Sequence, residues 1–168
     1  KGLKKLVDLS KKNFRSVNQM IADQPYRPEL IDLYNLYHYV LKNKRTTILE
    51  FGSGWSTLIF SLALKELRDK FLSRASLLSS NNLFELFVIE NEKKYLSNTK
   101  KKIQEFNKIL NIKNSIKINF FYSEVEMTTF NNRICTQYKN LPLCNPDFIY
   151  LDGPDQFNIK KNINGIST

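Results

Sequence analysis

The sequence predicts an α/β fold, in which a parallel β-sheet carries helices on both faces. Short apolar segments that suit strands alternate with longer segments whose apolar residues recur every three or four positions, as in helices. The strand candidates are almost continuously apolar, as expected for a sheet that is buried on both sides. The chain has 168 residues, of which 42% are hydrophobic, so it can form one domain with a substantial core.

Residues 1–45 are predicted to form a helical cap that precedes the sheet. The apolar positions of residues 1–22 are three or four apart, which indicates one amphipathic helix or two short ones. Pro25 and Pro28 interrupt this pattern because proline cannot continue a helix interior. A second helix is predicted from Leu30 to Leu41. We therefore divide the chain into the cap and a sheet domain over residues 46–168.

The sheet domain opens with a predicted strand over residues 46–51, followed by the turn Gly52-Ser53-Gly54. A helix is predicted from Ser56, and the hydroxyl of Ser56 or Thr57 is a suitable cap for its first N–H groups. Residues 71–82 are rich in Ser and Asn and are interpreted as a connector or an insertion.

The rest of the domain continues the alternation of strands and helices. The predicted elements are a strand over residues 83–90, a helix over 93–110, a strand over 116–122, a mixed segment over 124–145, a strand over 147–151 and a loop over 158–168. Polar or glycine residues follow the strands, at Gly52, Glu90, Glu124 and Asp152. Because the carboxyl ends of parallel strands share one edge of a sheet, we predict a ligand crevice at that edge.

The composition excludes several classes of protein. No apolar run approaches the ~20 residues that a membrane span needs. Cys135 and Cys144 are too few for a disulfide scaffold and do not form the paired motifs of a zinc site. We see no signal peptide, and we expect a cytoplasmic protein with reduced cysteines.

The net charge of +10 is compatible with nucleic acid or an anionic surface as a partner. However, Lys supplies 20 of the 26 basic residues and is spread along the whole chain. This distribution is typical of a general compositional bias, so nucleic-acid binding is not favoured. The sequence does not indicate an oligomeric state.

The segment from Glu50 to Ser56 is the strongest local motif. Gly52 and Gly54 allow a sharp turn and a close approach of the backbone to a ligand. The following helix presents unpaired N–H groups to whatever lies there. A dinucleotide-binding loop would have a third glycine where this chain has Thr57, and no P-loop lysine follows. A tight turn without a ligand remains the alternative interpretation.

Glu90 ends an apolar strand at the same predicted edge of the sheet. A carboxylate in this position can accept two hydrogen bonds from a ribose diol. An exposed loop acid is the alternative, but the pairing with the glycine turn favours a nucleoside site.

Four segments together, ILEFGSGWST, FVIEN, FFYSEVE and PDFIYLDGPD, resemble the class I S-adenosylmethionine-dependent methyltransferase family, whose domain is Rossmann-like. The resemblance covers about residues 46–157. It implies that S-adenosylmethionine is the cofactor and that its binding residues are Glu50, Gly52, Ser53, Gly54, Glu90, Ser123, Glu124 and Asp152. In this family the acid matched by Glu90 binds the ribose, the stretch matched by Ser123 and Glu124 contacts adenine, and the turn at Asp152 lies beside the methyl donor and the acceptor.

Two features depart from the family pattern. Glu50 and Glu90 are 40 residues apart, about twice the usual spacing of ~20, and we assign the excess to an insertion within residues 69–82. The family's sheet has seven strands, whereas only four are predicted here. We therefore expect that the carboxyl-terminal strands are missing from this chain, that it is the amino-terminal portion of a longer protein, and that one sheet edge is unpaired.

The predicted reaction is methyl transfer to an oxygen of a small-molecule or glycan-like acceptor. Asp152 is the candidate catalytic base, and no metal site is predicted, since Asp152 and Asp155 are more typical of a turn. Tyr26 and Arg27 are candidates to contact the carboxylate of the donor or the acceptor. The turn lacks the paired prolines and the aromatic residue of enzymes that methylate base amines. The alternatives are a nicotinamide-dependent oxidoreductase and a non-catalytic basic binding module with a methyltransferase-like fold.

Overall fold

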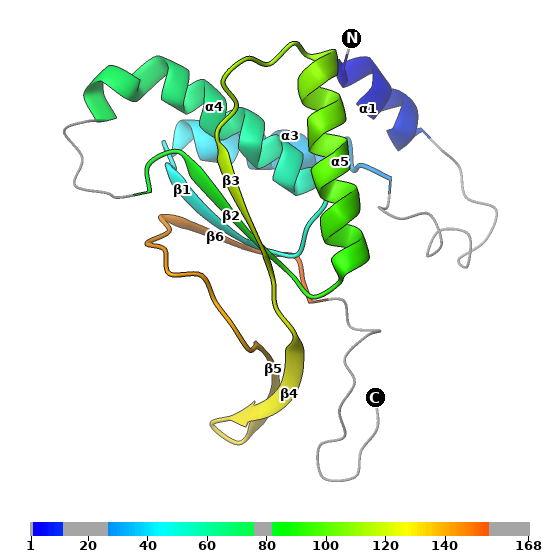
Figure 1. Ribbon diagram of the computed structural model, residues 1–168, viewed down its shortest axis with the longest axis vertical. Coiled ribbons are helices and arrows are strands. Elements are labelled where there is room, and N and C mark those ends of the chain that lie inside the picture. Colours follow the sequence, from blue (N-terminus) through cyan, green and yellow to red (C-terminus); the bar gives the residue numbers. More distant parts are fainter. Residues whose placement is uncertain (1, 12–26, 76–81, 155–168) are drawn as a thin grey trace.

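The computed structural model describes residues 2–11, 27–75 and 82–154 (Figure 1). Tyr26, Asp155 and the predicted loop over residues 158–168 lie outside this part of the chain. The described elements are α1 (Gly2–Ser10), α3 (Leu30–Lys42), β1 (Thr47–Phe51), α4 (Trp55–Ala75), β2 (Glu85–Glu90), α5 (Lys93–Ile109), β3 (Lys117–Tyr122), β4 (Val125–Phe130), β5 (Arg133–Tyr138) and β6 (Phe148–Leu151).

The predicted parallel sheet is confirmed. Four strands lie in the order β3-β2-β1-β6, and each neighbouring pair is parallel. In this register Glu50 of β1 lies between Val88 of β2 and Tyr150 of β6. The chain moves outward from β1 to β3 and then returns to the other side of β1. The strand order therefore reverses between β1 and β6, which is where open α/β sheets bind ligands.

One face of the sheet carries the main core. Ile48, Leu86 and Val88 are buried there against Phe60 of α4 and Val40 of α3. Helix α5 covers the β3 end of the same face through its buried residues Ile103 and Phe106, which pack with Ile118 and Phe120. Helix α3, from the predicted cap, thus shares a core with the sheet.

The prediction of helices on both faces is wrong for the described part of the chain. The opposite face has Leu49, Phe87 and Ile89, which pack against Tyr138 and the half-buried Cys144 rather than against a helix. Figure 1 shows the labelled helices on one side of the sheet and the β4–β5 hairpin on the other. The reason is topological: α4 and α5 belong to right-handed crossovers that run in the same direction, so both lie on one face.

The hairpin of β4 and β5 replaces the segment that was predicted as mixed. The two strands pair antiparallel from Val125–Tyr138 to Phe130–Arg133. Asn131 and Asn132, between them, have φ angles of 49° and 61°. Two consecutive positive φ angles match a type I′ turn, which asparagine tolerates well.

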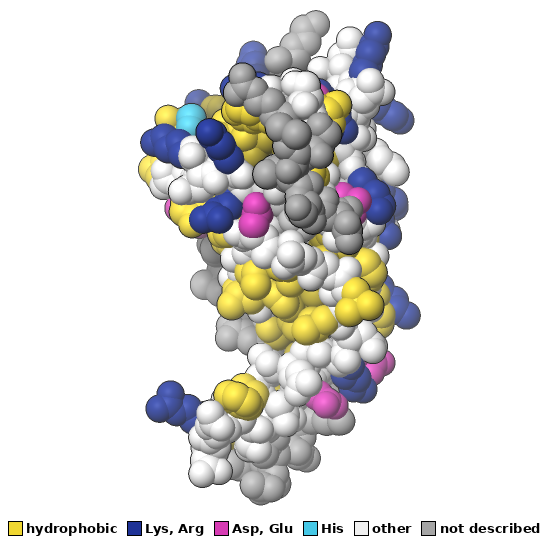
Figure 2. All heavy atoms as spheres, turned by 90° about the vertical axis from the view of Figure 1, so that its left-hand side faces the viewer, with side chains coloured by type: hydrophobic (Ala, Val, Ile, Leu, Met, Phe, Trp, Pro, Cys, Tyr) yellow, Lys and Arg dark blue, Asp and Glu magenta, His cyan; other side chains and the backbone are white. Residues whose placement is uncertain are grey.

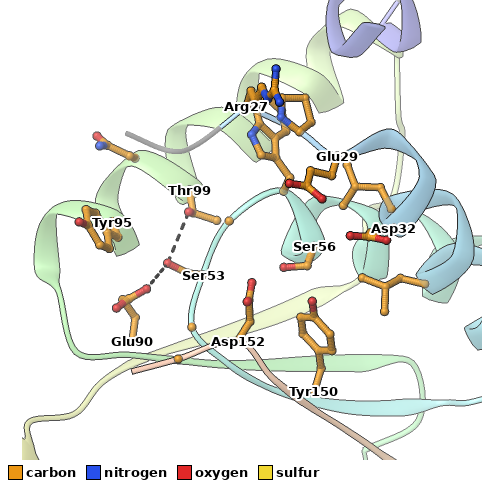
Figure 3. A pocket seen from close by; sticks show the side chains of 18 of the residues that line it. Arg27, Glu29, Asp32, Ser53, Ser56, Glu90, Tyr95, Thr99, Tyr150 and Asp152 are labelled. Atoms are coloured by element: carbon orange, nitrogen blue, oxygen red, sulfur yellow. Dashed lines mark hydrogen bonds between the residues drawn. The ribbon is translucent and has the colours of Figure 1, made fainter. Parts of the chain in front are cut away.

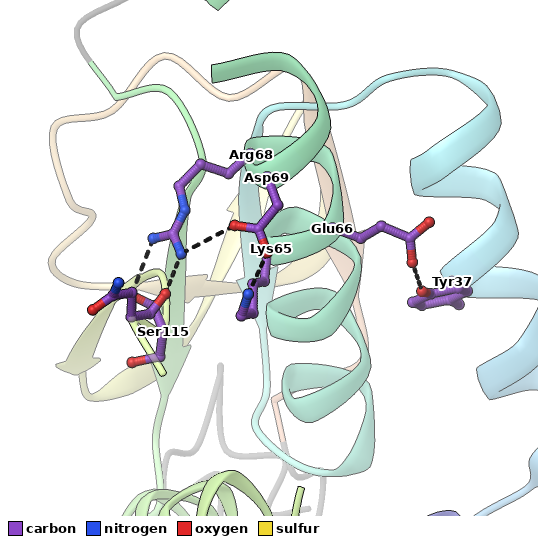
Figure 4. A network of polar contacts seen from close by, with 7 residues as sticks. Tyr37, Lys65, Glu66, Arg68, Asp69 and Ser115 are labelled. Carbon is purple, nitrogen blue, oxygen red and sulfur yellow. Dashed lines mark hydrogen bonds and ion pairs between the residues drawn. The ribbon is translucent and has the colours of Figure 1, made fainter. Parts of the chain in front are cut away.

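Helix α4 is longer than predicted, because residues 71–75 continue it rather than forming a connector. The insertion over residues 69–82, which we assigned as the cause of the wide spacing between Glu50 and Glu90, is thus helical up to Ala75. Figure 4 shows polar contacts that hold the part of the helix just before residue 71. Arg68 donates to the carbonyl oxygens of Asn114 and Ser115, just before β3, and the hydroxyl of Tyr37 on α3 donates to Glu66.

The surface around β6 is apolar. Leu141, Leu143, Ile149 and Leu151 are exposed. Figure 2 shows apolar side chains gathered at mid-height on the side of the molecule where β6 lies. Among the described residues, no helix has the length and the apolar composition to cross a bilayer.

Candidate functional site

A cavity of about 570 Å³ opens at the carboxyl ends of β1 and β6, where the strand order reverses (Figure 3). Its size is in the range of small-molecule sites. It is lined by Arg27, Pro28, Glu29, Asp32, Leu33, Leu36, Gly52, Ser53, Gly54, Trp55, Ser56, Glu90, Tyr95, Asn98, Thr99, Tyr150, Asp152, Gly153 and Pro154.

The turn Gly52-Ser53-Gly54 lines this cavity and is held by close backbone contacts. Gly52 has a φ of +99°, and a Cβ built on it would lie 2.8 Å from the backbone oxygen of Asp152. The Gly52 N–H donates to the carbonyl of Ile89 at 2.8 Å, and the Asp152 N–H donates to that of Phe51 at 2.8 Å. Only glycine therefore fits at position 52, where three strand ends meet closely.

Glu90 and the glycine turn meet as predicted. Ser53 donates its hydroxyl hydrogen to Glu90 Oε2 at 2.7 Å, and the Glu92 N–H donates to Oε1 at 3.0 Å. Thr99 of α5 contacts the Ser53 oxygen at 3.5 Å. Glu90 is only 3% exposed, and burial raises its pKa. Ser53 thus occupies one acceptor position of this carboxylate and must rotate away before a ligand hydroxyl can use it.

Glu50 lies behind the cavity wall rather than in it. Its side chain is fully buried, Ser56 donates to Oε1, and within the described residues Oε2 has no hydrogen-bond partner. Burial is the main cause that raises the pKa of Glu50 to about 8, and the negative charges of Asp152 and Glu90 add to it. The carboxyl group is therefore mostly neutral at pH 7.

The start of helix α4 differs from the predicted cap. The helix begins at Trp55, so Ser56 lies inside its first turn, and its hydroxyl binds Glu50 instead of a backbone N–H. Thr57 does cap the helix: its hydroxyl accepts from the Gly54 N–H at 3.0 Å. This is the contact by which the third helical residue reaches back to the cap position.

The far side of the cavity from Glu90 is acidic. Glu29 and Asp32 come from the start of α3, and Asp152 follows β6, with the Tyr150 hydroxyl near them (Figure 3). Burial raises the pKa of Tyr150 to about 12, with smaller contributions from Asp152, Glu50 and Asp32. Burial also raises the pKa of Asp152. Arg27 is the basic residue among the described lining residues.

The structure brings together most, but not all, of the predicted site residues. Gly52, Ser53, Gly54, Glu90 and Asp152 line one cavity. Glu50 lies one layer behind them.

Ser123 and Glu124 do not line the cavity. The buried Ser123 hydroxyl accepts from the Asn140 N–H at 3.0 Å, and the exposed Glu124 pairs with Lys139 at 2.7 Å. Their contact with adenine stays a prediction.

Sequence reasoning missed the contribution of two helices. Tyr95, Asn98 and Thr99 line the cavity from one face of α5, at spacings of three and four. None of these three residues was among the predicted site residues. Glu29 and Asp32 enter from α3, and only the three-dimensional arrangement brings that helix to the site.

Comparisons with known proteins identify no relative: no family model, no curated protein and no solved structure matches this chain. Among residues 2–11, 27–75 and 82–154, no group of three or more metal-ligating side chains is present.

Proposed function

We propose that the protein is an S-adenosylmethionine-dependent methyltransferase that transfers a methyl group to an oxygen of a small-molecule or glycan-like acceptor. One observation carries this proposal. The glycine turn after β1 and the buried acid after β2 share a cavity at the reversal of strand order, with Ser53 and Glu90 in direct contact at 2.7 Å. The motif resemblance then selects the sulfonium cofactor among nucleoside ligands.

The residues present fit this cofactor. Glu90 provides a carboxylate for the ribose diol, and Tyr95 and Asn98 provide further polar groups on the same side. Gly52 removes a side chain where the backbone must approach the ligand. Arg27 lines the cavity, and a guanidinium suits the carboxylate of the methionine part.

The bound cofactor would supply an electrophilic methyl group, so the chain itself has to position the acceptor and receive a proton. The new carbon–oxygen bond of the acceptor would replace the carbon–sulfur bond of the bound donor, whose electron pair would stay on sulfur. Asp152 would take the hydroxyl proton. Burial raises the pKa of Asp152 toward the range in which a base is effective. Two carboxylates beside the cavity, Asp152 and Glu90, also favour a positively charged sulfur.

Isothermal calorimetry with S-adenosylhomocysteine tests the donor site. We expect the wild-type protein to bind it, and Glu90→Gln to weaken binding about tenfold to a hundredfold, since a hydrogen bond to a charged group is worth ~1.5–3 kcal/mol. Glu105→Gln is the matched control because Glu105 is an exposed residue on α5 that pairs with Lys5. No binding at millimolar ligand would contradict the proposal, and an unchanged affinity of Glu90→Gln would remove Glu90 from the ribose role.

Two other functions are separated by simple titrations. A nicotinamide-dependent oxidoreductase would bind NADH, and the fluorescence of NADH would change on binding. The third glycine of a dinucleotide-binding loop is replaced here by Thr57, which is fully buried. A basic binding module predicts retention on anionic resin with a steep salt dependence and no response to nucleosides. The acidic wall of the cavity does not favour this module.

A further inference from the structure

A second cavity, of about 330 Å³, adjoins the first one and has no role in the donor site described above. Asp32, Leu36 and Tyr150 line both cavities, so the two lie side by side. The second cavity also has Asn35, Tyr39 and Phe148 in its walls.

The second cavity is lined by residues of one helix, α3, and one strand, β6. Its residues on α3 are 32, 35, 36 and 39, spaced so that they share one face of the helix. Its residues on β6 are Phe148 and Tyr150, two positions apart and therefore on the same side of the strand. The cavity is thus a groove between α3 and β6, and Tyr150 at one end of it is two residues before Asp152 of the first cavity.

The groove has an aromatic wall and an acidic end. The rings of Tyr39 and Phe148 lie 5.1 Å apart at an angle of 39°, and Tyr39 is 45% exposed. At the junction with the first cavity, the carboxylates of Asp32 and Asp152 flank the Tyr150 ring (Figure 3). A flat apolar group can pack on the rings while a cation lies at the junction.

The charge of the lining residues contrasts with that of the chain. Among the described residues that line the two cavities, Arg27 is the basic one, whereas Glu29, Asp32, Glu90 and Asp152 carry carboxylates. The whole chain has a net charge of +10. The lysine residues that give the chain its positive charge therefore do not line the two cavities in the described part of the chain. The carboxylates that do line them attract cations and repel anions.

We infer that this groove binds the acceptor and that the acceptor is a small molecule with a flat, apolar or aromatic body and a protonated amine beside its reacting hydroxyl. The body lies against Tyr39 and Phe148, the amine lies near Asp32, and the hydroxyl faces Asp152. This inference rests on the proposed methyl transfer, because Asp152 has to lie next to the transferred group.

Three probes of matched size test the charge preference: 2-amino-1-phenylethanol, 1-phenylethane-1,2-diol and mandelate. They share a ring and an adjacent hydroxyl, and their remaining group is cationic, neutral or anionic. Binding to the wild-type protein is measured by ligand-observed NMR, with and without S-adenosylhomocysteine. We expect the amine to bind at least fivefold more tightly than the diol, and mandelate to bind most weakly. Equal affinities, or no amine binding at 5 mM, would overturn the inference.

Variants then locate the binding. Asp32→Asn should weaken the amine about threefold to tenfold and leave the diol unchanged, whereas Tyr39→Ala should weaken both. Asp69→Asn is the matched control, because Asp69 is an exposed acid near the other end of α4, where it pairs with Lys65. Amine binding that survives both groove variants would place the probe elsewhere and refute the groove.

The donor and acceptor experiments fail independently. Absence of S-adenosylhomocysteine binding would contradict the proposed function, while the charge preference is read from the protein without that ligand. If the donor product binds and the three probes do not differ, the inference about the acceptor fails and the proposed function stands.

Discussion

Gly52→Ala is expected to lower the free energy of unfolding by about 3 kcal/mol and to abolish S-adenosylhomocysteine binding. A positive φ at a residue with a side chain costs ~1–3 kcal/mol. The new methyl group would also lie 2.8 Å from the Asp152 oxygen and 3.0 Å from its carbonyl carbon. These are backbone atoms, so β6 would have to move away from β1, at a further cost of ~1–3 kcal/mol. Urea unfolding followed by circular dichroism measures the change.

Gly54→Ala provides the matched control in the same turn. A Cβ at Gly54 has no neighbour within 4 Å, and no positive φ requires glycine there. We expect its stability to stay within about 1 kcal/mol of wild type, since alanine also reduces the entropy of the unfolded chain. Gly54 lines the cavity, so this variant can weaken ligand binding without unfolding. Equal destabilisation by both variants would show that the close contact at Gly52 does not control stability.

The sequence was sufficient for the sheet because short apolar segments and glycine turns are local features. The meeting of Glu90 with the turn at Gly52 followed from the rule that parallel strand ends share an edge. The hairpin at Asn131 and Asn132 also had a local indication, two asparagines between segments with β-forming residues, which was overlooked.

Other parts of the site had no local indication. Asp32 looks like an ordinary acid near the start of a helix, and only the packing of α3 beside β6 brings it to the cavity. In the described part of the chain the helices lie on one face rather than on both, because alternation of strands and helices does not specify the side of each crossover. The end of α4 was placed too early because residues 71–82 as a whole are rich in Ser and Asn, although Phe71 packs against the main core. Long-range contacts such as that of Arg68 with Ser115 hold the helix just before residue 71.

Glu50→Gln is expected to change how stability depends on pH. Burial raises the pKa of Glu50 to about 8, against an ordinary value of 4.5 in an unfolded chain. Between these values the folded protein holds a proton that the unfolded chain releases. The free energy of unfolding therefore falls as the pH rises, with a slope of up to ~1.4 kcal/mol per pH unit from this group. Above pH 8 the group is ionised in the folded and the unfolded chain alike, so it contributes no further loss of stability.

Glu50→Gln removes the titratable carboxyl group and keeps a side chain of nearly the same shape. Its amide oxygen can still accept from Ser56, but its amide N–H groups need acceptors in place of the unpartnered Oε2. At pH 5 we therefore expect Glu50→Gln to be ~1–2 kcal/mol less stable than wild type. At pH 9 the order should reverse, and the two stability curves should cross near neutral pH. Urea unfolding at pH 5, 7 and 9 measures this, and parallel curves would show that Glu50 is already ionised in the folded protein at pH 5.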